Sequence, residues 1–173
     1  MTFLQMAKNR YSARKFTERK VEQQQIDQIL EAARIAPTAR NNQPQHVIVI
    51  TDPELLERLK ECTVYTFHAP LNFLICYDVK KAWIRASDKK EMGHVDIAIV
   101  VTHMMLAIED IGLGATWVSG FDPIKAAEIF DLPENIIPVA LMPTGYPVDP
   151  PRIGPLHEQR IDIQDFVHYN RFK

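Results

Sequence analysis

Cysteine and glycine are both scarce in this sequence of 173 residues, which has two cysteines and six glycines. Cys62 and Cys76 lie far apart with no C-x-x-C pair, which excludes a disulfide framework and a cysteine zinc site. We expect both cysteines to be reduced, buried thiols. The few glycines form no P-loop and no G-x-S-x-G turn, so the parts of a kinase or a serine hydrolase are missing.

The chain also lacks an excess of charge of one sign. Its formal net charge is −2, and its six histidines form no H-E-x-x-H or H-x-H pair. We therefore expect neither nucleic acid nor an anionic membrane as a partner, and no metal site. No basic and then apolar leader opens the sequence, so we expect a cytoplasmic protein.

A long run without charge is absent as well. The most apolar stretch, 94–112, is interrupted by Asp96, His103, Glu109 and Asp110. It never reaches the roughly 18 uncharged residues that indicate a transmembrane helix. It predicts instead a helix that is apolar nearly all round and lies in the centre of a globule or between two subunits.

Apolar residues are plentiful, at 46% of the chain, which is enough for one domain over residues 1–173. Periodicity and stop signals predict helices over 3–10, 21–36, 52–62, 94–112 and 122–133, the last with Ile124, Ala127 and Phe130 on its apolar side. Strands are predicted over 46–51, 71–77 and 135–147, with a short one after the glycine turn at 112–117. Few strands separated by helices favour an α+β or α/β class.

Two further segments stand apart from these elements. Residues 80–93 form a polar segment between the predicted elements, and we interpret it as a candidate mobile lid. The proline-rich tail that follows residue 147 is too apolar for a disordered end, because it contains Ile153, Leu156, Ile161, Ile163, Phe166 and Val167. We expect this tail to pack along a surface, with that of another subunit as a candidate.

Basic side chains alternate with other residues in the segment RYSARKF at 10–16. In an extended backbone Arg10, Ser12 and Arg14 point to the same side and form a donor set suited to phosphate. A solvated basic patch is the alternative interpretation of so short a pattern. The glycine turn at 112–117 follows a helix and precedes a strand, the reverse of a dinucleotide fingerprint, so a Rossmann site is rejected.

Four segments in this order resemble the FMN-dependent nitroreductase family. They are R-x-S-x-R-x-F at 10–16, APTARNNQP at 36–44, a helix from Asp96 that ends in GLGATW, and GYP at 145–147 before a basic tail. The resemblance implies an α+β, three-layer fold with a mainly antiparallel central sheet flanked by helices. It also implies a C-terminal tail that wraps the partner subunit of a homodimer.

The resemblance further implies a set of FMN-binding residues. Arg10, Ser12 and Arg160 would hold the phosphate and ribityl chain, with Tyr11 and His157 beside them, and Arg14 would lie at the N1–C2=O edge of the flavin. Pro37, Thr38 and Asn41 would approach from the other subunit. The backbone of Val118, Ser119 and Gly120 would lie along the flavin, with a main-chain N–H, that of Ser119 by preference, donating to N5. No catalytic side chain is implied.

The activity that this resemblance implies is transfer of reducing equivalents from NAD(P)H to a nitroaromatic, quinone or related small acceptor by a ping-pong mechanism. Two alternatives stay open at this point. One is a specific reductase of an enone or halogenated-aromatic metabolite, and the other is a flavin-binding or storage module without turnover. Independently of the resemblance, the apolar central helix, the apolar tail and the polar TARNN loop favour a dimer with shared sites.

Overall fold

Four strands form one antiparallel sheet in the order β1-β2-β4-β3 in the computed structural model of the chain, which describes residues 2–172. The strands are β1 (Gln45–Ile50), β2 (Leu71–Asp78), β3 (Gly114–Ala115) and β4 (Ile136–Gly145). β2 lies in the middle and pairs with β1 on one side and with β4 on the other. The three long predicted strands are confirmed, and the strand predicted after the glycine turn is the two-residue β3 at the sheet edge.

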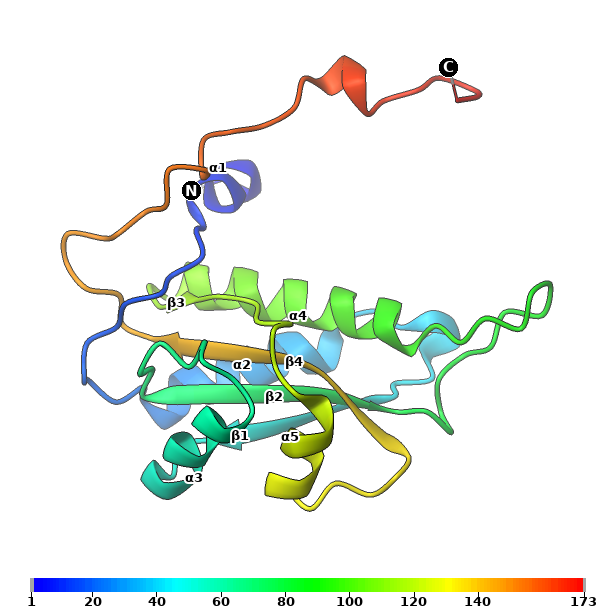
Figure 1. The fold of residues 1–173 in the computed structure, drawn as a ribbon. Helices are drawn as coiled ribbons and strands as arrows, with labels where there is room; N and C mark the ends of the chain where they lie inside the picture. The colour runs from blue at the N-terminus through cyan, green and yellow to red at the C-terminus, as the bar shows by residue number, and fades with distance from the viewer. Residues whose placement is uncertain (1, 173) are drawn as a thin grey trace.

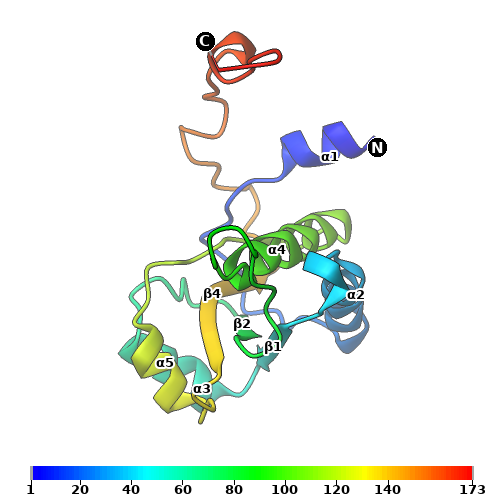
Figure 2. The same ribbon diagram turned by 90° about the vertical axis from the view of Figure 1, so that its right-hand side faces the viewer.

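Side chains of β2 alternate between two hydrophobic clusters, one on each face of the sheet. Phe73 and Ile75 face the cluster made with α2 (Gln23–Ile35) and α4 (Gly93–Asp110). Leu74 faces the cluster made with α3 (Pro53–Arg58) and α5 (Pro123–Ile129). Figures 1 and 2 show α2 and α4 on one side of the sheet and α3 and α5 on the other. This is the three-layer α+β arrangement that the family resemblance implies.

Two of the helices begin where the sequence places a capping aspartate before a proline. The Asp52 carboxylate accepts from the N–H groups of the first turn of α3, and Asp122 does the same for α5. α3 continues into the short 3-10 helix η2 (Leu59–Glu61). A capping aspartate satisfies N–H groups that have no partner within the helix, which explains why these helix starts are predictable from local sequence.

The predicted apolar side of α5 is wrong at Ile124, although Phe130 does pack against the hydrophobic cluster on this face of the sheet. Its buried residues are Ala126 and Ile129, whereas Ile124 is 73% exposed. Ala127 is only partly buried. A residue two positions away lies about 200° around a helix, so Ile124 points away from the sheet when Ala126 faces it. A helix of 7 residues has too few apolar positions for periodicity to decide which stripe packs.

α4 is the predicted central helix, and its polar residues occupy different environments. Asp96 is buried at 2% exposure, His103 is partly buried and Asp110 is exposed. Val101 is completely buried against the sheet. A second stripe, formed by Val95, Ala98, Ile99, Thr102 and His103, lines a shallow apolar groove on the opposite side. Within residues 2–172, no helix has the length and apolar character needed to cross a membrane.

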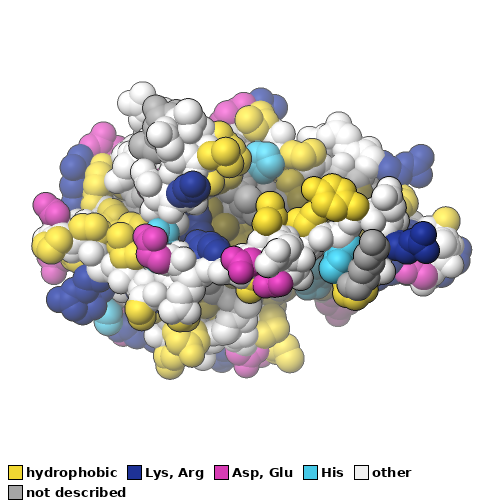
Figure 3. All heavy atoms as spheres, turned by 90° about the horizontal axis from the view of Figure 1, so that it is seen from above, with side chains coloured by type: hydrophobic (Ala, Val, Ile, Leu, Met, Phe, Trp, Pro, Cys, Tyr) yellow, Lys and Arg dark blue, Asp and Glu magenta, His cyan; other side chains and the backbone are white. Residues whose placement is uncertain are grey.

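Three segments extend from this core. α1 (Phe3–Asn9) and the tail, which contains the 3-10 helix η3 (Ile163–Asp165), lie above α4 in Figure 1, and a hairpin of residues 80–92 projects at the other end of that helix. Seen from above, the face that carries α1 and the tail exposes many hydrophobic side chains (Figure 3). The tail does not pack on its own sheet, and Ile161, Ile163 and Phe166 are each more than half exposed.

Candidate functional site

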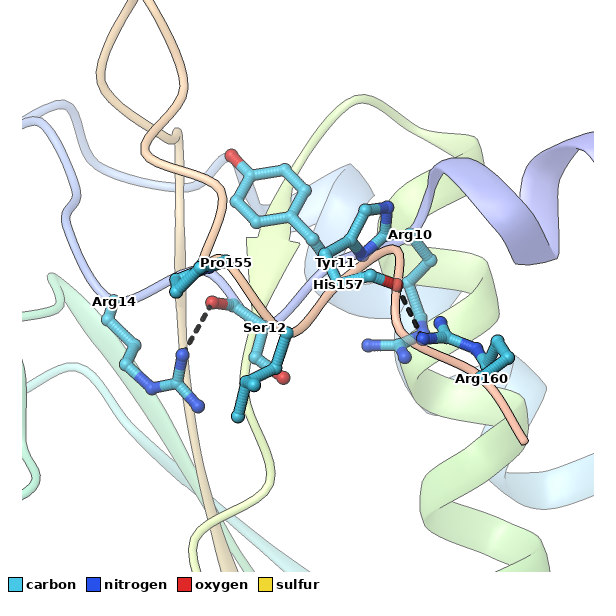
Figure 4. Close-up of a pocket in the computed structure, with 9 residues that line it drawn as sticks. Arg10, Tyr11, Ser12, Arg14, Pro155, His157 and Arg160 are labelled. Carbon is cyan, nitrogen blue, oxygen red and sulfur yellow. Dashed lines mark hydrogen bonds between the residues drawn. The ribbon is translucent and has the colours of Figure 1, made fainter.

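A basic pocket lies where the segment after α1 meets the tail. Its volume is about 350 Å³, and it is lined by Arg10, Tyr11, Ser12, Arg14, Gly154, Pro155, Leu156, His157 and Arg160. Figure 4 shows the guanidinium groups of Arg10 and Arg160 close together on one side of Ser12, with that of Arg14 on the other. The structure thus brings together six residues that the sequence analysis had picked from two distant segments.

Segment 10–16 is extended, as predicted, because it runs beside the edge strand β3. Ser12 forms a parallel bridge with Ala115, and the Ala13 N–H donates to the Ala115 carbonyl at 3.1 Å. Ala13 is buried, so its neighbours Ser12 and Arg14 point out toward the pocket. A glycine is needed at 114, since a Cβ there would lie 2.6 Å from that of Ala13.

The arginines of the basic pocket form few contacts within the protein. Arg14 donates to the Ser12 carbonyl at 3.5 Å, and Arg160 donates to the carbonyls of His157 at 2.5 Å and Gln159 at 2.7 Å. In the described chain, Arg10, Arg14 and Arg160 form no salt bridge. A guanidinium group has five N–H donors, so most of the donors in this pocket remain available to a bound anion.

Sequence reasoning missed four residues at this pocket. Gly154, Pro155 and Leu156 close one side of it, and Glu109 of α4 lies near enough to interact electrostatically with Arg10 and His157. Burial raises the pKa of the Glu109 carboxyl, and the charges of Arg10 and His157 oppose that rise. Burial and the charge of Glu109 also raise the pKa of Tyr11. In the sequence, the one indication that residues 154–156 belong to the pocket was that they directly precede His157.

The loop around Thr38 and Asn41 is held at the opposite end of α4. The buried Asp96 carboxylate accepts from the Ala39 N–H at 2.8 Å, and the Thr38 hydroxyl accepts from the Gln43 N–H at 3.0 Å. Ala39–Asn41 form the 3-10 helix η1, in which Asn41 has a positive φ of 56°. A non-glycine residue in this left-handed region costs free energy, and here the surrounding hydrogen bonds hold it.

One chain does not bring this loop to its own basic pocket. Asp96, which holds the loop, and Glu109, which lies beside Arg10, are thirteen positions apart on one straight helix. At 1.5 Å of rise per residue they are separated by about 20 Å along the axis. Pro37, Thr38 and Asn41 therefore lie apart from Arg10, Ser12 and Arg160 in the same chain, at the other end of α4.

The segment 118–120 follows the edge strand β3, and its first residue, Val118, pairs with Leu141 of β4. The Val118 N–H donates to the Leu141 carbonyl at 2.8 Å, so this N–H group is not available to a ligand. Within residues 2–172, the N–H groups of Ser119 and Gly120 have no acceptor. The Tyr65 ring lies against Gly120, where a Cβ would meet it at 2.9 Å. The N–H groups of Ser119 and Gly120 are therefore the donors that this segment leaves open.

Comparison with known proteins places this arrangement in a family. The model described as the Nitroreductase family matches residues 7–67 and 66–146. The chain belongs to the nitroreductase family. The match includes RYSARKF, the Thr38–Asn41 loop and the 118–120 backbone, and it ends before the segment that closes the basic pocket. That closing segment is thus outside the part of the chain that the family model describes.

Relatives and solved structures agree with this assignment. A protein of Methanothermobacter thermautotrophicus is 32% identical over 164 residues, which cover 87% of this chain and 80% of that protein. The FMN reductase (NAD(P)H) of Bacillus subtilis is 29% identical, with 80% of this chain and 63% of that protein covered. The solved structure of a nitroreductase family protein from Clostridium difficile 630 matches at a TM-score of 0.93 and 38% identity, over 99% of this chain and 100% of that one.

Proposed function

We propose that this chain is an FMN-dependent oxidoreductase that works as a homodimer and passes reducing equivalents from NAD(P)H to a small acceptor such as a nitroaromatic or a quinone. The basic pocket carries the proposal, because its three arginines form no salt bridge in the described chain. Guanidinium groups gathered in this way repel one another unless they face an anion, and phosphate is the anion that suits their donor geometry.

The donors present in the pocket fit one phosphate and one flavin. We propose that Arg10, Ser12 and Arg160 hold the phosphate and ribityl chain, with Tyr11 and His157 beside them. This set contains enough basic groups for the single phosphate of FMN and no βαβ fingerprint for a second nucleotide half. The printed name of the Bacillus subtilis relative, an FMN reductase that uses NAD(P)H, supports the same cofactor and electron donor.

Two further contacts would tune and orient the flavin. Arg14 lies on the other side of Ser12 from Arg10 and Arg160, where it would reach the N1–C2=O edge and favour negative charge there (Figure 4). We propose that the Ser119 N–H, which has no acceptor in residues 2–172, donates to N5. No side-chain acid or base is required, and none is proposed.

The second half of each site would come from a partner subunit. Pro37, Thr38 and Asn41 lie at the far end of α4 from the basic pocket of their own chain, so a two-fold axis is the simplest way to join the halves. The apolar groove along α4 and the exposed apolar tail, which would wrap the partner, provide the surfaces to be buried. We also propose that residues 1–173 act as one domain in the cytoplasm, a compartment that fits the free thiols of Cys62 and Cys76.

FMN, when bound, supplies the redox chemistry, accepting electrons from NAD(P)H and passing them to the acceptor. The chain's own contribution is to hold and orient: the arginines fix the phosphate end, and the 118–120 backbone fixes the reactive end. NAD(P)H and the acceptor would then use the same open face of the flavin, one after the other. We therefore infer ping-pong kinetics, in which NAD(P)⁺ leaves before the acceptor enters.

A visible spectrum of the purified protein tests the proposal. We expect a yellow protein from which heat releases FMN, which loses its colour on anaerobic addition of NAD(P)H and regains it with a quinone or nitroaromatic. A yellow protein that neither nucleotide bleaches would instead be a flavin-storage module. A protein that stays colourless after incubation with FMN would reject the proposed function.

A further inference from the structure

The hairpin of residues 80–92, called the basic hairpin below, projects from the body at the N-terminal end of α4 (Figure 1). Its two arms meet at an antiparallel bridge between Ile84 and Glu91, and its turn is closed by the N–H of Lys89 donating to the Arg85 carbonyl at 2.9 Å. The Asp88 carboxylate accepts from Arg85 and from the Lys90 N–H. The tip is therefore an ordered turn rather than a loose loop.

Positive charge is concentrated on this hairpin. It contains five basic and two acidic residues, in a chain whose net charge is −2. Arg85 is paired with Asp88. Within residues 2–172, the remaining four basic side chains are exposed and form no salt bridge; these are Lys80, Lys81, Lys89 and Lys90. The basic hairpin thus presents several ammonium groups that form no salt bridge, although Lys81 and Lys90 interact electrostatically with Asp78 and Asp88.

The base of the hairpin is held by a polar cluster. The Tyr77 hydroxyl donates to the Glu91 carboxylate at 2.7 Å and lies 3.2 Å from the Nδ1 atom of His94. The Glu91 carboxylate also accepts from the Gly93 N–H, and the Met92 N–H donates to the Trp83 carbonyl at 3.0 Å. This cluster fixes the direction in which the arms project, so less ordering would be needed when a ligand binds.

The hairpin is also joined to the half of the flavin site that we assign to the partner subunit. The Asn42 side chain, next to Asn41, donates to the Lys81 carbonyl at 2.9 Å. If Thr38 and Asn41 approach the flavin of the other subunit, the basic hairpin must project beside that same flavin. Its arms extend roughly 15–20 Å from the loop at the rise of extended chain, which takes the tip lysines away from the flavin itself.

We propose that the basic hairpin binds the 2′-phosphate of NADPH and makes this nucleotide the preferred electron donor. The inference rests on the proposed function, because it places the nicotinamide on the flavin of the neighbouring subunit. The 2′-phosphate is at the adenosine end of the nucleotide, far from the nicotinamide, as the tip is far from the flavin. It is also the group that NADH lacks, and a dianionic phosphate is a strong partner for exposed ammonium groups.

The double variant Lys89→Ala/Lys90→Ala tests the proposal. We expect wild-type kcat/KM to be higher for NADPH than for NADH, and the variant to lower this ratio about five-fold through KM, as two exposed charge contacts would. Raising the salt concentration should lower the wild-type ratio in the same direction, because exposed pairs are screened. The control Lys20→Ala/Lys60→Ala removes the same charge from exposed lysines elsewhere and should keep the wild-type ratio.

Three results would overturn the proposal. They are a wild-type enzyme that does not prefer NADPH, an equal rise in both KM values in the hairpin variant, or an equal effect of the control variant. An equal rise in both KM values would assign the lysines to a phosphate common to both nucleotides or to general attraction. Failure of the proposed function is a separate outcome, since the wild-type protein would then bind no FMN or be bleached by neither nucleotide.

Discussion

Strand β2 and the C-terminal tail are both rich in large apolar side chains, and the structure treats them in opposite ways. All eight residues of β2 are buried, whereas Ile161 and Ile163 of the tail are 68% and 71% exposed. β2 has a hydrogen-bonded strand on each edge and a helix layer on each face. The tail has neither. An apolar composition therefore predicts that a segment is buried, but it does not indicate whether the covering surface belongs to the same chain or to another one.

This difference separates the part of the molecule that one chain completes from the part that it leaves open. The sheet and its two helix layers are complete in one chain. The basic pocket is formed by the tail and the segment after α1, and the loop that would complete it lies at the other end of α4. Exposed apolar surface next to an incomplete site is typical of an interface between subunits.

The largest expected effect is on stability in the core. Phe73 is completely buried in β2, so Phe73→Ala should lower the free energy of unfolding by about 3–5 kcal/mol through lost transfer energy and a cavity. Phe166→Ala in the tail, where the side chain is 58% exposed, is the matched control. Urea unfolding at low protein concentration should show less than about 0.5 kcal/mol for the control. Equal losses would mean that the tail belongs to the core of its own chain.

Mixing two defective subunits should restore up to about one quarter of the sites if the sites are shared. Arg10→Ala removes one half of a site and Asn41→Ala the other, so each homodimer should bind FMN poorly. A heterodimer of the two would contain one site with both changes and one site with neither. Flavin titration after unfolding and refolding the mixture should therefore recover up to about one quarter of wild-type sites, because half of random dimers are mixed. No recovery would place both halves in one chain.

The two arginines flanking Ser12 should differ in what they affect. Arg10→Ala should weaken FMN binding by about ten- to a hundred-fold, the usual loss for one charge-assisted hydrogen bond. Arg14→Ala should lower the reduction potential of the bound flavin and slow its reduction while more FMN stays bound. Equilibrium titration and a dye-coupled potential measure the two quantities. Identical changes in both would contradict the division of roles proposed for the basic pocket.

The smallest expected effect is a pH dependence at Glu109. Burial raises the pKa of this carboxyl, so it loses its proton only as the pH rises above the usual range for glutamate. Its negative charge then attracts Arg10 electrostatically and repels a phosphate. Glu109→Gln should bind FMN about three-fold more tightly than wild type at pH 8, as expected for one partly screened charge.

At low pH, the wild-type protein and the Glu109→Gln variant should bind FMN equally. The carboxyl group of Glu109 is then protonated, and it is uncharged like the glutamine side chain. Comparing two proteins at each pH cancels the titration of the FMN phosphate itself. The ratio of dissociation constants is the quantity to plot. A ratio that does not change with pH would mean that Glu109 acts through packing and not through its charge.

Much of the local structure could be predicted because its causes lie within a few residues. Asp52 and Asp122 each precede a proline at the start of a predicted helix, and in the structure both side chains cap their helix. The continuous apolar run at 71–77 predicted a strand, and β2 is buried along its whole length. The alternation of Arg10, Ser12 and Arg14 predicted three side chains on one side of an extended segment, and all three line the basic pocket.

Other features depend on which distant surfaces meet, and no local pattern decides that. Ile124 and Ala126 are equally plausible as the buried residue of α5, and only packing on the sheet settles the choice. Glu109 was assigned to an apolar helix, and its place beside Arg10 follows from the path of the segment after α1 over that helix. Likewise, the tail closes the pocket with residues that carry no charge or motif.

The sequence by itself determined the helix starts, the buried strands and the donor types of the site, since hydrogen bonding and burial preferences act over one or two turns of chain. Tertiary structure alone decided that the Asn41 loop and the basic pocket lie at opposite ends of α4. The two sites are held apart by α4, a helix of 18 residues. The sequence predicts the length of this helix, but it does not predict which segments pack at its two ends. Those neighbours arrive from segments far away in the chain, and their positions follow from the packing of the whole core.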